Sequence, residues 1–547
     1  MGIYINKGNV AFESVLNSRY VDKTDFIAVV NATLKSEDQF ICATRCRRFG
    51  KSMMAKTLCA YYDKSCDSRE LFKGLKIAQD PSFEKHLNKY NVLYLDVTSF
   101  TTYPEYRGHI VKSIKEAMTK EVRRAFPNVE FDGDEDLMGC LQAIYVQTGE
   151  RFYFIIDEWD AICREFPQRR KYKNSPVDVE PTEMDEYVMF LRRLFKSQGS
   201  EEIFVGAYLT GILPMMKFET ESALNNFREY SMVTPRAAAG SFGFVPAEVK
   251  SLCDKYGMDY DELAAWYDGY QIGNEPSVFN PNSVMNAINA RQCSSFWAAT
   301  GAFTRVADYI SMNYEGLKDD IIKMLAGGRC PVDPTGFVNN MSEVSSKDDV
   351  FTVLIHLGYL GYDASRKECY IPNMEVRGEM INAVKSNNWK EVAGILQSSR
   401  DLLEATITGE ADKVASMIDR AHQENTSILS YNDENSLSSV LSLAYIYARG
   451  EYILHRELAS GKGFADLVFI PRSFVDRPAM IIELKCDKTA DAAIDQIRRK
   501  EYQGKVLEYL NTPSGKGREK ALLLVGINYD KESKTHTCVI QKYADDK

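Results

Sequence analysis

The sequence contains no run of about 18 apolar residues, so a membrane-spanning helix is not expected. Its first residues, MGIYINKGNVAF, lack a charged segment followed by an apolar one, which argues against a secretory signal peptide. The 12 cysteines form no C-x-x-C pair, so a zinc ribbon is not expected either. Without an export signal, reduced thiols are the simplest interpretation, and we expect a cytoplasmic protein with no membrane partner.

The chain also has no excess of basic over acidic residues. The chain has 67 Lys and Arg against 77 Asp and Glu, a net charge of −10. This balance excludes a basic coat over the whole protein but not a local basic groove. The six histidines show no metal-ligand spacing. With 45% hydrophobic residues in 547, the chain can bury large cores, and at roughly 150 residues per domain we expect two to four domains.

Short apolar runs alternate with segments long enough for helices in the first third of the chain. We expect strands at 39–44, 91–100, 151–157 and 202–211, and helices at segments such as 52–62 and 105–125. This alternation is typical of a parallel sheet covered by helices on both faces. The charged, proline-containing stretch 166–185 is expected to be a surface loop.

The pattern changes twice after residue 225. From about 225 to 430 it is mostly helical, with one strand pair expected around 358–372. The last part predicts a helix, three strands, a helix and two further strands, at 434–450, 451–457, 464–471, 479–485, 490–510, 521–530 and 537–543. The fold class is therefore α/β, with predicted domains at 1–225, 226–385 (a mainly helical middle region) and 386–547.

Residues 44–52, TRCRRFGKS, lie between an expected strand and an expected helix. A Gly-Lys-Ser at such a turn suits phosphate binding, because the helix N-terminus presents free N–H groups and a positive dipole end. Lys51 would reach the β- and γ-phosphates and Ser52 would hold Mg²⁺. The pattern G-x-x-x-x-G-K-[ST] is only partly met, since Gly50 is present but Arg45 occupies the first glycine position. Taken alone, the motif also fits a basic surface turn.

A second motif, RFYFIIDEWD at 151–160, is an apolar strand that ends in Asp157 and Glu158. An Asp at this position orients the Mg²⁺ shell, and the following Glu can polarise the attacking water. An acidic helix cap is the alternative interpretation. The later strand EIFVGAYLTG places Thr210 at its end, where a hydroxyl could sense the γ-phosphate or the water.

Two carboxylates and a lysine form a further candidate site near the C-terminus. Asp466 begins one expected strand, and Glu483 and Lys485 end the next; their spacing of two puts both on one strand face. Such a group can bind Mg²⁺ and activate a water, with Lys485 orienting it. E-x-K is also common on solvated strands, but AMIIELK is too apolar for such a face. Glu434 could supply another carboxylate.

The ordered motifs resemble a known family. YVDKTDFI (20–27), TRCRRFGKS, IIDEWD, YLTGI (208–212), ALNNF (223–227), WYDGY (266–270), VFNPNSV (278–284), LGYLGY (357–362) and IPNMEV (371–376) are similar to the bacterial AAA-ATPase-like domain. Members are usually fused to a C-terminal PD-(D/E)XK nuclease. The resemblance covers nearly the whole chain, and an Arg at the first glycine position is typical of it. Cys46 and Trp159 replace the family's usual Pro and Tyr.

This resemblance implies a P-loop NTPase fold with specific site residues. It assigns nucleotide contacts to Arg45, Arg48, Gly50, Lys51, Ser52 and Thr210, Mg²⁺ ligation to Ser52 and Asp157, and water activation to Glu158. AAA-like cores often work as rings, so a homo-oligomer is compatible with it.

The C-terminal element order, with Glu434 on the first helix, resembles the αβββαβ PD-(D/E)XK fold. This likeness assigns metal ligation to Glu434, Asp466 and Glu483 and catalysis to Asp466, Glu483, Lys485 and Gln496, the last of which, with Tyr502, resembles the family's helix motif. Lys462 and Phe464 replace two arginines of the family's G-R-G-R-x-D, which puts DNA affinity in doubt. Four nearby basic residues could meet DNA phosphates or form a solvated helix face: Arg498, Arg499, Lys500 and Lys505.

We therefore expect a protein that binds and hydrolyses ATP and carries a Mg²⁺-dependent DNA endonuclease domain, for which Mn²⁺ could substitute. The alternative is a nucleotide-gated switch whose nuclease-like domain binds nucleic acid or protein without cutting. A pure interaction protein with two decayed sites is disfavoured, because the candidate phosphate, metal and water residues are all present.

Overall fold

The computed structural model describes residues 2–133, 135–165, 182–215, 224–297, 303–312, 314–337, 344–386, 390–425, 440–441, 443–460, 463–510 and 521–543. The chain forms two compact units. Unit 1 comprises Met1–Met258, Tyr267–Phe296 and Pro331–Pro372, and unit 2 comprises Asp259–Trp266, Trp297–Cys330 and Asn373–Lys547. The three predicted domain boundaries stay a prediction. Within the described ranges, no helix is both long and apolar enough to span a bilayer.

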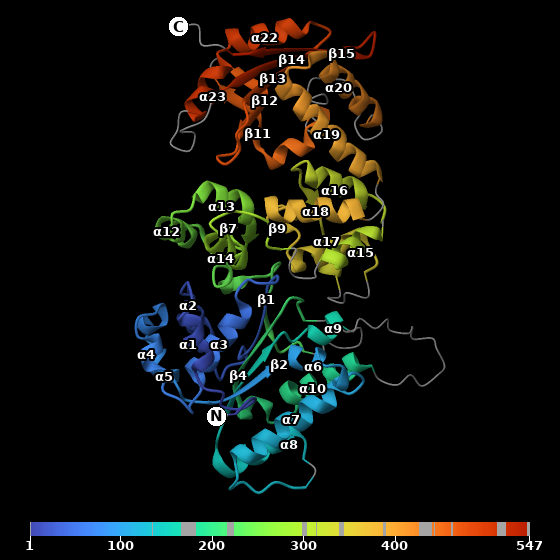
Figure 1. Ribbon diagram of the computed structural model, residues 1–547. Coiled ribbons are helices and arrows are strands. Elements are labelled where there is room, and N and C mark those ends of the chain that lie inside the picture. The colour runs from blue at the N-terminus through green and yellow to red at the C-terminus, as the bar shows by residue number, and fades with distance from the viewer. Residues whose placement is uncertain are drawn as a thin grey trace, which may run out of the picture. The chain divides into compact units, whose positions relative to one another are not determined.

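Unit 1 contains a five-stranded, fully parallel sheet in the order β2-β3-β4-β1-β5 (Figure 1). Its strands are β1 Phe40–Thr44, β2 Asn91–Asp96, β3 Phe152–Asp157, β4 Phe204–Gly211 and β5 Arg228–Tyr230. Every residue of β1, β3 and β4 is buried, as expected for strands covered on both faces. The first four strands confirm the predicted sheet, whereas β5, with only three residues, was not predicted.

Helices cover both faces of this sheet because alternate strand residues enter two separate cores. One core contains Phe154 and Ile156 with residues of α7 (Ile110–Ala125), α8 (Leu137–Thr148) and α10 (Glu183–Lys196). The other contains Tyr153 and Ile155 with residues of α1 (Val10–Leu16), α2 (Asp25–Asn31) and α3 (Lys51–Tyr62). Shorter helices are α4 Arg69–Phe72, α5 Phe83–His86, α6 Thr98–Thr101, α9 Ala161–Glu165, α11 Ser200–Ile203, and the 3₁₀ helices η1 Lys76–Gln79, η2 Pro104–Tyr106 and η3 Arg236–Ala238.

The predicted surface loop at 166–185 can be tested only at its end, because 166–181 lie outside the described residues. There the prediction was wrong, since α10 begins at Glu183. Thr182 and Asp185 form a capping box in which each side chain accepts from the other's backbone N–H. Part of the polar segment that suggested a loop is therefore the start of a helix.

The middle of the chain is mainly helical, as predicted. Its elements are α12 Pro246–Tyr256, α13 Tyr260–Tyr267, α14 Pro281–Ala290, α15 Phe303–Ser311, α16 Leu317–Leu325, α17 Lys347–Leu357, α18 Met374–Ser386, η5 Pro334–Gly336 and the two-residue strand β8 Cys330–Pro331. The strand pair expected at 358–372 is confirmed as β9 (Gly361–Asp363) and β10 (Glu368–Tyr370). A second hairpin, β6 (Tyr270–Ile272) with β7 (Glu275–Val278), was not predicted.

Unit 2 contains a mixed five-stranded sheet in the order β11-β12-β13-β14-β15. The strands are β11 Tyr452–Ser460, β12 Gly463–Pro471, β13 Ala479–Cys486, β14 Leu522–Asp530 and β15 Thr535–Lys542. Only β13 and β14 run parallel, and their crossover contains α22 (Ala490–Arg499) and α23 (Tyr502–Leu510). The strands and the helical crossover follow the order along the chain that the sequence predicted.

The two faces of the unit 2 sheet are covered by different helices (Figure 1). Residues of α22 and α23 share one core with the sheet. Residues of α19 (Lys390–Thr408) and α20 (Ala411–Asn425) share the other. The single helix expected at 490–510 is broken, because Glu501 adopts a left-handed φ of 58°. Of the helix expected at 434–450, residues 434–439 lie outside the described residues, and its end is the 3₁₀ helix η6, Ile446–Gly450.

Candidate functional site

The loop between β1 and α3 is the segment predicted to form a phosphate cradle. Arg48 and Gly50 both adopt left-handed backbone conformations, with φ of 66° and 88°. Gly50 is the N-cap of α3, and no side chain caps this helix. The N–H groups of the first turn therefore have no partner within the helix, and they lie at its positive dipole end. This geometry suits a bound anion.

The structure brings the two predicted halves of this site together. The Ser52 hydroxyl donates to Asp157 Oδ1 at 3.0 Å, which joins the start of α3 to the end of β3. The Lys51 ammonium donates to the backbone carbonyl of Cys46 at 3.0 Å, within the same loop. Lys51 is only 4% exposed, so its charge is held inside the cradle.

Three polar side chains end neighbouring strands at the same sheet edge. In the strand register, Asp157 on β3 lies opposite Asp96 on β2 and opposite Thr210 on β4. Burial, followed by the neighbouring charge of Glu158, raises the pKa of Asp157 to about 6, although the Ser52 hydrogen bond opposes this shift. The Tyr94 hydroxyl also donates to Asp157, at 3.3 Å. Asp96 and Tyr94 were not predicted, because nothing in their own motif distinguishes them from ordinary strand residues.

Glu158 is held by a residue that the sequence analysis missed. Its backbone is left-handed, with φ of 52°, and its carboxylate forms an ion pair with Arg164 on α9. Arg164 Nε also lies 3.0 Å from Asp160 Oδ2. Asp160 in turn accepts from the backbone N–H groups of Ile212 and Leu213, at 3.1 and 2.8 Å. The turn after β3 is therefore fixed to the segment after β4.

Trp159 strengthens the same connection. Its indole Nε1 donates to the Leu213 carbonyl at 3.2 Å, and its own N–H donates to the Thr210 carbonyl at 2.9 Å. Trp159 is buried. The Trp that replaces the family's usual Tyr therefore has a structural partner of its own.

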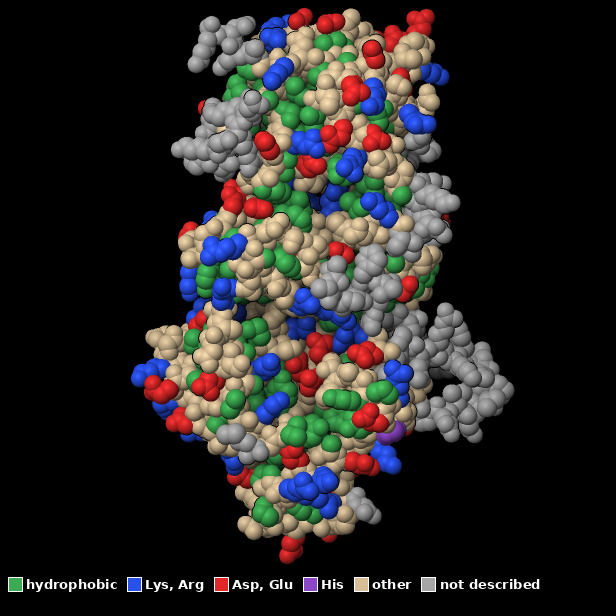
Figure 2. Space-filling model, in the orientation of Figure 1, with side chains coloured by type: hydrophobic (Ala, Val, Ile, Leu, Met, Phe, Trp, Pro, Cys, Tyr) green, Lys and Arg blue, Asp and Glu red, His purple; other side chains and the backbone are tan. Residues whose placement is uncertain are grey.

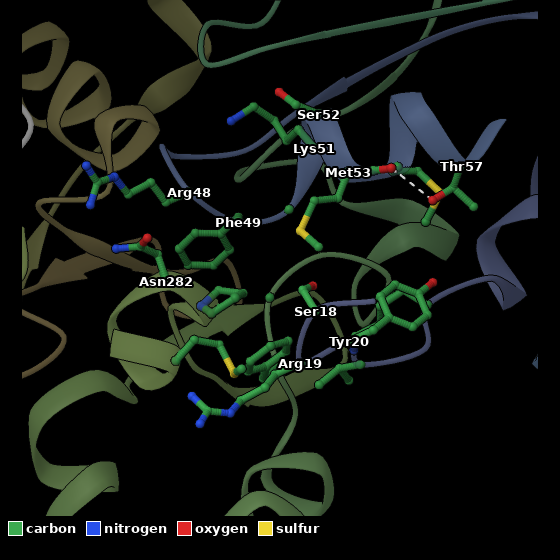
Figure 3. A pocket seen from close by; sticks show the side chains of 18 of the residues that line it. Ser18, Arg19, Tyr20, Arg48, Phe49, Lys51, Ser52, Met53, Thr57 and Asn282 are labelled. Carbon is green, nitrogen blue, oxygen red and sulfur yellow. Dashed lines mark hydrogen bonds between the residues drawn. The ribbon is translucent and has the colours of Figure 1, made fainter. Parts of the chain in front are cut away.

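A cavity of about 610 Å³ opens beside the cradle (Figure 3). Five of the predicted residues line it: Arg48, Gly50, Lys51, Ser52 and Glu158. The remaining lining includes aromatic, apolar and amide side chains, among them Tyr20, Phe49, Phe244, Asn282 and Met285. Its volume is within the range of small-molecule and cofactor sites. A phosphate cradle next to a mixed apolar and polar chamber can hold both ends of a nucleotide.

Arg45 and Thr210 do not line this cavity, and both are fully buried. The Arg45 guanidinium donates to the carbonyls of Thr44 and Tyr230, both at 2.8 Å, and of Ala238, at 2.9 Å. Burial lowers the pKa of Arg45 to about 10. In the structure this side chain ties β1 to β5 and η3, and its contact with a nucleotide stays a prediction. The sensor role of Thr210 stays a prediction.

The second candidate site lies on the face of the unit 2 sheet that α22 and α23 cover. Asp466 Oδ2 accepts from the Leu484 N–H at 2.8 Å, which places Asp466 beside the end of β13. The Lys485 ammonium donates to Glu483 Oε1 at 2.9 Å and to the Leu484 carbonyl at 2.8 Å. Gln496 on α22 donates to the same Glu483 oxygen. The structure therefore brings all four of these predicted residues together.

Glu483 is the most perturbed group of this cluster. It is 1% exposed, and burial, followed by the nearby charge of Asp466, raises its pKa to about 7, whereas Lys485 acts in the opposite direction. Its second oxygen, Oε2, is buried and has no hydrogen-bond partner among the described residues. Tyr502 lies close enough for Glu483 and Asp466 to raise its pKa as well, after burial.

The donor set fits a hard divalent cation. A buried carboxylate oxygen without a partner, next to a second carboxylate, is costly unless a proton or a cation occupies the site. Within the described ranges, however, no group of three or more His, Cys, Asp or Glu could hold a metal. Two protein carboxylates would therefore need water or substrate oxygens as further ligands, or Glu434, which lies outside the described residues.

Other predicted residues of this region are only partly testable. Lys462 lies outside the described residues, as do the side chains of Phe464 and Lys505. Arg498 and Arg499 are exposed, and Arg498 donates to Gln541 Oε1 at 3.1 Å. Contact between this helix face and DNA stays a prediction.

Comparisons with known proteins identify two domains in this chain. Residues 11–220 match the family model described as predicted AAA-ATPase, and residues 433–537 match that of the PD-(D/E)XK nuclease superfamily. A curated relative, an uncharacterized protein in the vnfD 5′ region of Azotobacter chroococcum mcd 1, is 23% identical over 305 residues. That match covers 53% of this chain and 52% of the relative, so the chain spans about half the length of the curated relative it matches.

Among solved structures, the ORC2 protein of Aeropyrum pernix matches over 70% of this chain and 99% of its own. Its identity is 12% and its TM-score 0.29, values too low to bear on function. The two family models, together with the parallel sheet of unit 1 and the mixed sheet of unit 2, define the architecture. The chain therefore combines an AAA-ATPase-like domain at its N-terminus with a PD-(D/E)XK nuclease superfamily domain at its C-terminus.

Proposed function

We propose that this chain binds and hydrolyses ATP and that its C-terminal domain is a Mg²⁺-dependent DNA endonuclease. The observation that carries the proposal is the buried Glu483 carboxylate, whose Oε2 has no partner among the described residues while Oε1 accepts from Lys485 and Gln496. A carboxylate oxygen that is buried without a partner at the end of an apolar strand lowers the stability of the fold. Such a group is expected where the protein binds a cation.

For ATP binding, the cradle supplies the N–H groups of the first turn of α3 and the ammonium of Lys51. Lys51 now donates to the Cys46 carbonyl, so binding requires it to exchange this neutral acceptor for phosphate oxygens. Ser52 and Asp157 would share a Mg²⁺ ion between the Walker A and Walker B segments. Their hydrogen bond of 3.0 Å means that little movement of either side chain is needed.

For hydrolysis, Glu158 would orient and polarise the attacking water. In the structure it is paired with Arg164, which holds its carboxylate by charge. Because Glu158 also lines the cavity, turning it from Arg164 toward a water beside the γ-phosphate is a local change.

For phosphodiester cleavage, Asp466 and Glu483 would hold the divalent ion, which supplies charge neutralisation and lowers the pKa of a bound water. Oxygen donors favour Mg²⁺, with Mn²⁺ as a substitute. Gln496, which donates to Glu483, would fix the orientation of that carboxylate, and Lys485 would orient the attacking water. We also propose the boundaries 1–225, 226–385 and 386–547 for the three parts, a cytoplasmic location, and assembly into a homo-oligomer.

The test is incubation of plasmid and single-stranded DNA with the full-length protein and Mg²⁺ or Mn²⁺, with and without ATP. Asp466→Ala and Lys485→Ala should each abolish cleavage, whereas the exposed Lys531→Ala should not. Metal binding, measured by calorimetry, should fall in Asp466→Ala and survive in Lys485→Ala. If the wild-type protein leaves every DNA form intact and binds no divalent ion at this site, the nucleotide-gated switch replaces the nuclease.

A further inference from the structure

Four arginines converge in unit 2 away from the candidate catalytic group. Arg377 lies on α18, Arg449 on η6, Arg456 on β11, and Arg472 directly after β12. Burial first, and then the charges of Arg456 and Arg472, lowers the pKa of Arg449. Burial first, and then the charges of Arg449 and Arg472, lowers the pKa of Arg377. In a chain with a net charge of −10, composition does not explain such a gathering. Figure 2 shows basic and acidic side chains interspersed over most of the face that it draws.

Arg449 is the centre of this arginine cluster. Its guanidinium packs closely against Gly327, since a Cβ at that glycine would fall 2.2 Å from Arg449 Nη1. Gly327 has a φ of 80°, so both its conformation and its missing side chain make room for the arginine. Arg449 Nε is buried, and in the part of the chain that the structure describes the guanidinium has neither a hydrogen-bond acceptor nor an ion-pair partner. A guanidinium N–H that is buried without an acceptor loses its hydration with no hydrogen bond to replace it.

The other arginines hold the cluster in place. Arg377 donates through Nε and Nη2 to the Leu325 carbonyl, both at 3.4 Å, and through Nη2 to the Ile446 carbonyl. Arg472 Nη2 donates to the Arg449 carbonyl at 3.3 Å. Burial and the neighbouring arginines lower the pKa values of both Arg377 and Arg449 to about 10, so each guanidinium remains charged at neutral pH. Repulsion among fixed cations is relieved by an anion.

We infer that the cluster of Arg377, Arg449, Arg456 and Arg472 is a phosphate-binding site for the backbone of the nucleic acid on which the C-terminal domain acts. Guanidinium groups bind phosphate oxygens through two parallel hydrogen bonds. Arg456 lies opposite Leu467 in the β11–β12 register, and Leu467 follows Asp466. Leu467 packs in the core shared with α19 and α20, so Arg456 lies on the sheet face opposite that of Asp466, and the edge strand β11 separates the cluster from the candidate metal ligand. A polymer with repeated phosphates can reach both places.

This inference rests on the proposed function, because it assumes that the domain's substrate is a nucleic acid. Its test must therefore measure binding rather than cutting. Fluorescence anisotropy with labelled duplex and single-stranded DNA, in EDTA and over a series of NaCl concentrations, gives both the Kd and its salt dependence. The variants are Arg449→Gln, Arg449→Lys and the exposed Arg456→Gln, with Lys413→Gln, which removes an exposed charge paired with Glu410, as the matched control.

Arg449→Gln should weaken DNA binding about tenfold and lower the slope of log Kd against log salt by about one, as for one lost phosphate contact. Arg449→Lys should keep the slope, and Lys413→Gln should change neither quantity. Without DNA, Arg449→Gln should melt at the same or a higher temperature, because like-charge repulsion is reduced. A purely structural arginine would give a lower melting temperature instead.

Unchanged Kd and slope in Arg449→Gln and Arg456→Gln would overturn the inference. It would also be overturned if inorganic phosphate or ATP stabilised wild type but not Arg449→Gln while DNA affinity stayed equal, since the site would then take a free phosphate compound. If Arg449→Gln does not fold, Arg456→Gln decides. The two proposals can fail separately. If Asp466→Ala loses cleavage but keeps the wild-type salt dependence of DNA binding, both proposals are supported. If DNA binds through the arginine cluster and is not cut by the wild-type protein, only the nuclease proposal fails.

Discussion

Metal binding at Asp466 and Glu483 should depend strongly on pH, because Glu483 carries a proton over much of the neutral range. Its pKa is raised from 4.5 to about 7. At pH 6 about nine-tenths of the Glu483 side chains are protonated, and at pH 8 about one-tenth are. A divalent cation must displace this proton. Affinity should therefore be about tenfold weaker at pH 6 than at pH 8, with close to one proton released per ion at pH 6 and almost none at pH 8.

The raised pKa of Glu483 also makes the stability of the folded protein depend on pH. A carboxyl group whose folded-state pKa is raised binds its proton more tightly in the folded protein than in the unfolded chain. Its contribution to stability is fully present below pH 4.5 and is lost as the pH rises to about 7. The loss amounts to about 3 kcal/mol. The charges that face Glu483 are Asp466 and Lys485, with the Tyr502 hydroxyl nearby. A bound cation should restore the stability lost at high pH, and EDTA should remove it again.

Calorimetric titration of Mn²⁺ or Mg²⁺ into nucleotide-free protein, in buffers of different ionisation enthalpy, measures both the affinity and the proton release. Glu483→Gln should abolish the release, because the amide has no proton to give. Asp157→Asn serves as the control, because Asp157 is a carboxylate with a raised pKa that lies in unit 1. Equal proton release at pH 6 and pH 8, or release that persists in Glu483→Gln, would refute the assignment of Glu483 as a metal ligand.

Three further predictions concern unit 1. Lys51→Ala should weaken ATP binding at least about tenfold, because it removes the cation of the cradle, while Lys56→Ala on the same helix should not; equilibrium binding of a fluorescent ATP analogue measures both. Glu158→Gln should keep ATP binding and lose hydrolysis in a phosphate-release assay, and unchanged turnover would contradict its role as the water-activating residue. Arg45→Met should lower the free energy of unfolding by at least about 3 kcal/mol, because three buried carbonyls lose their donor. Weaker ATP binding at unchanged thermal stability would instead show that Arg45 contacts the nucleotide.

The sequence predicted strands and site positions best where an apolar run ends in a polar residue. Asp157 ends β3 and Glu483 lies near the end of β13, and both motifs were readable because burial and chemistry change within a few residues. The pairing partners of these strands could not be read in the same way. The three-residue strand β5 carries Arg228 and Glu229, and its pairing with β1 depends on contacts far away in the chain.

Side-chain direction was harder to predict than position. Arg45 follows β1 at the expected place in the motif, yet it turns into the protein toward Tyr230 and Ala238. Arg164 lies on a different element from Glu158, so no short-range pattern reveals that they form an ion pair. The break between α22 and α23 also lacks a Gly or Pro signal, since Glu501 itself takes the left-handed conformation. Tertiary contacts decide each of these features.

The two candidate sites share one physical cause. In each, a carboxylate at the end of an apolar strand is buried next to a second acidic group, Glu158 beside Asp157 and Asp466 beside Glu483, and both buried carboxyls have a raised pKa. Each unit therefore contains a local electrostatic cost that a cation can remove. In the arginine cluster of unit 2 the unfavourable interaction is repulsion between positive charges, which a bound anion would relieve. A nuclease substrate with its metal ion would relieve both costs of unit 2 together, so DNA and Mn²⁺ should stabilise this unit more when added together than the sum of their separate effects. Purely additive stabilisation would show that the two groups serve different ligands.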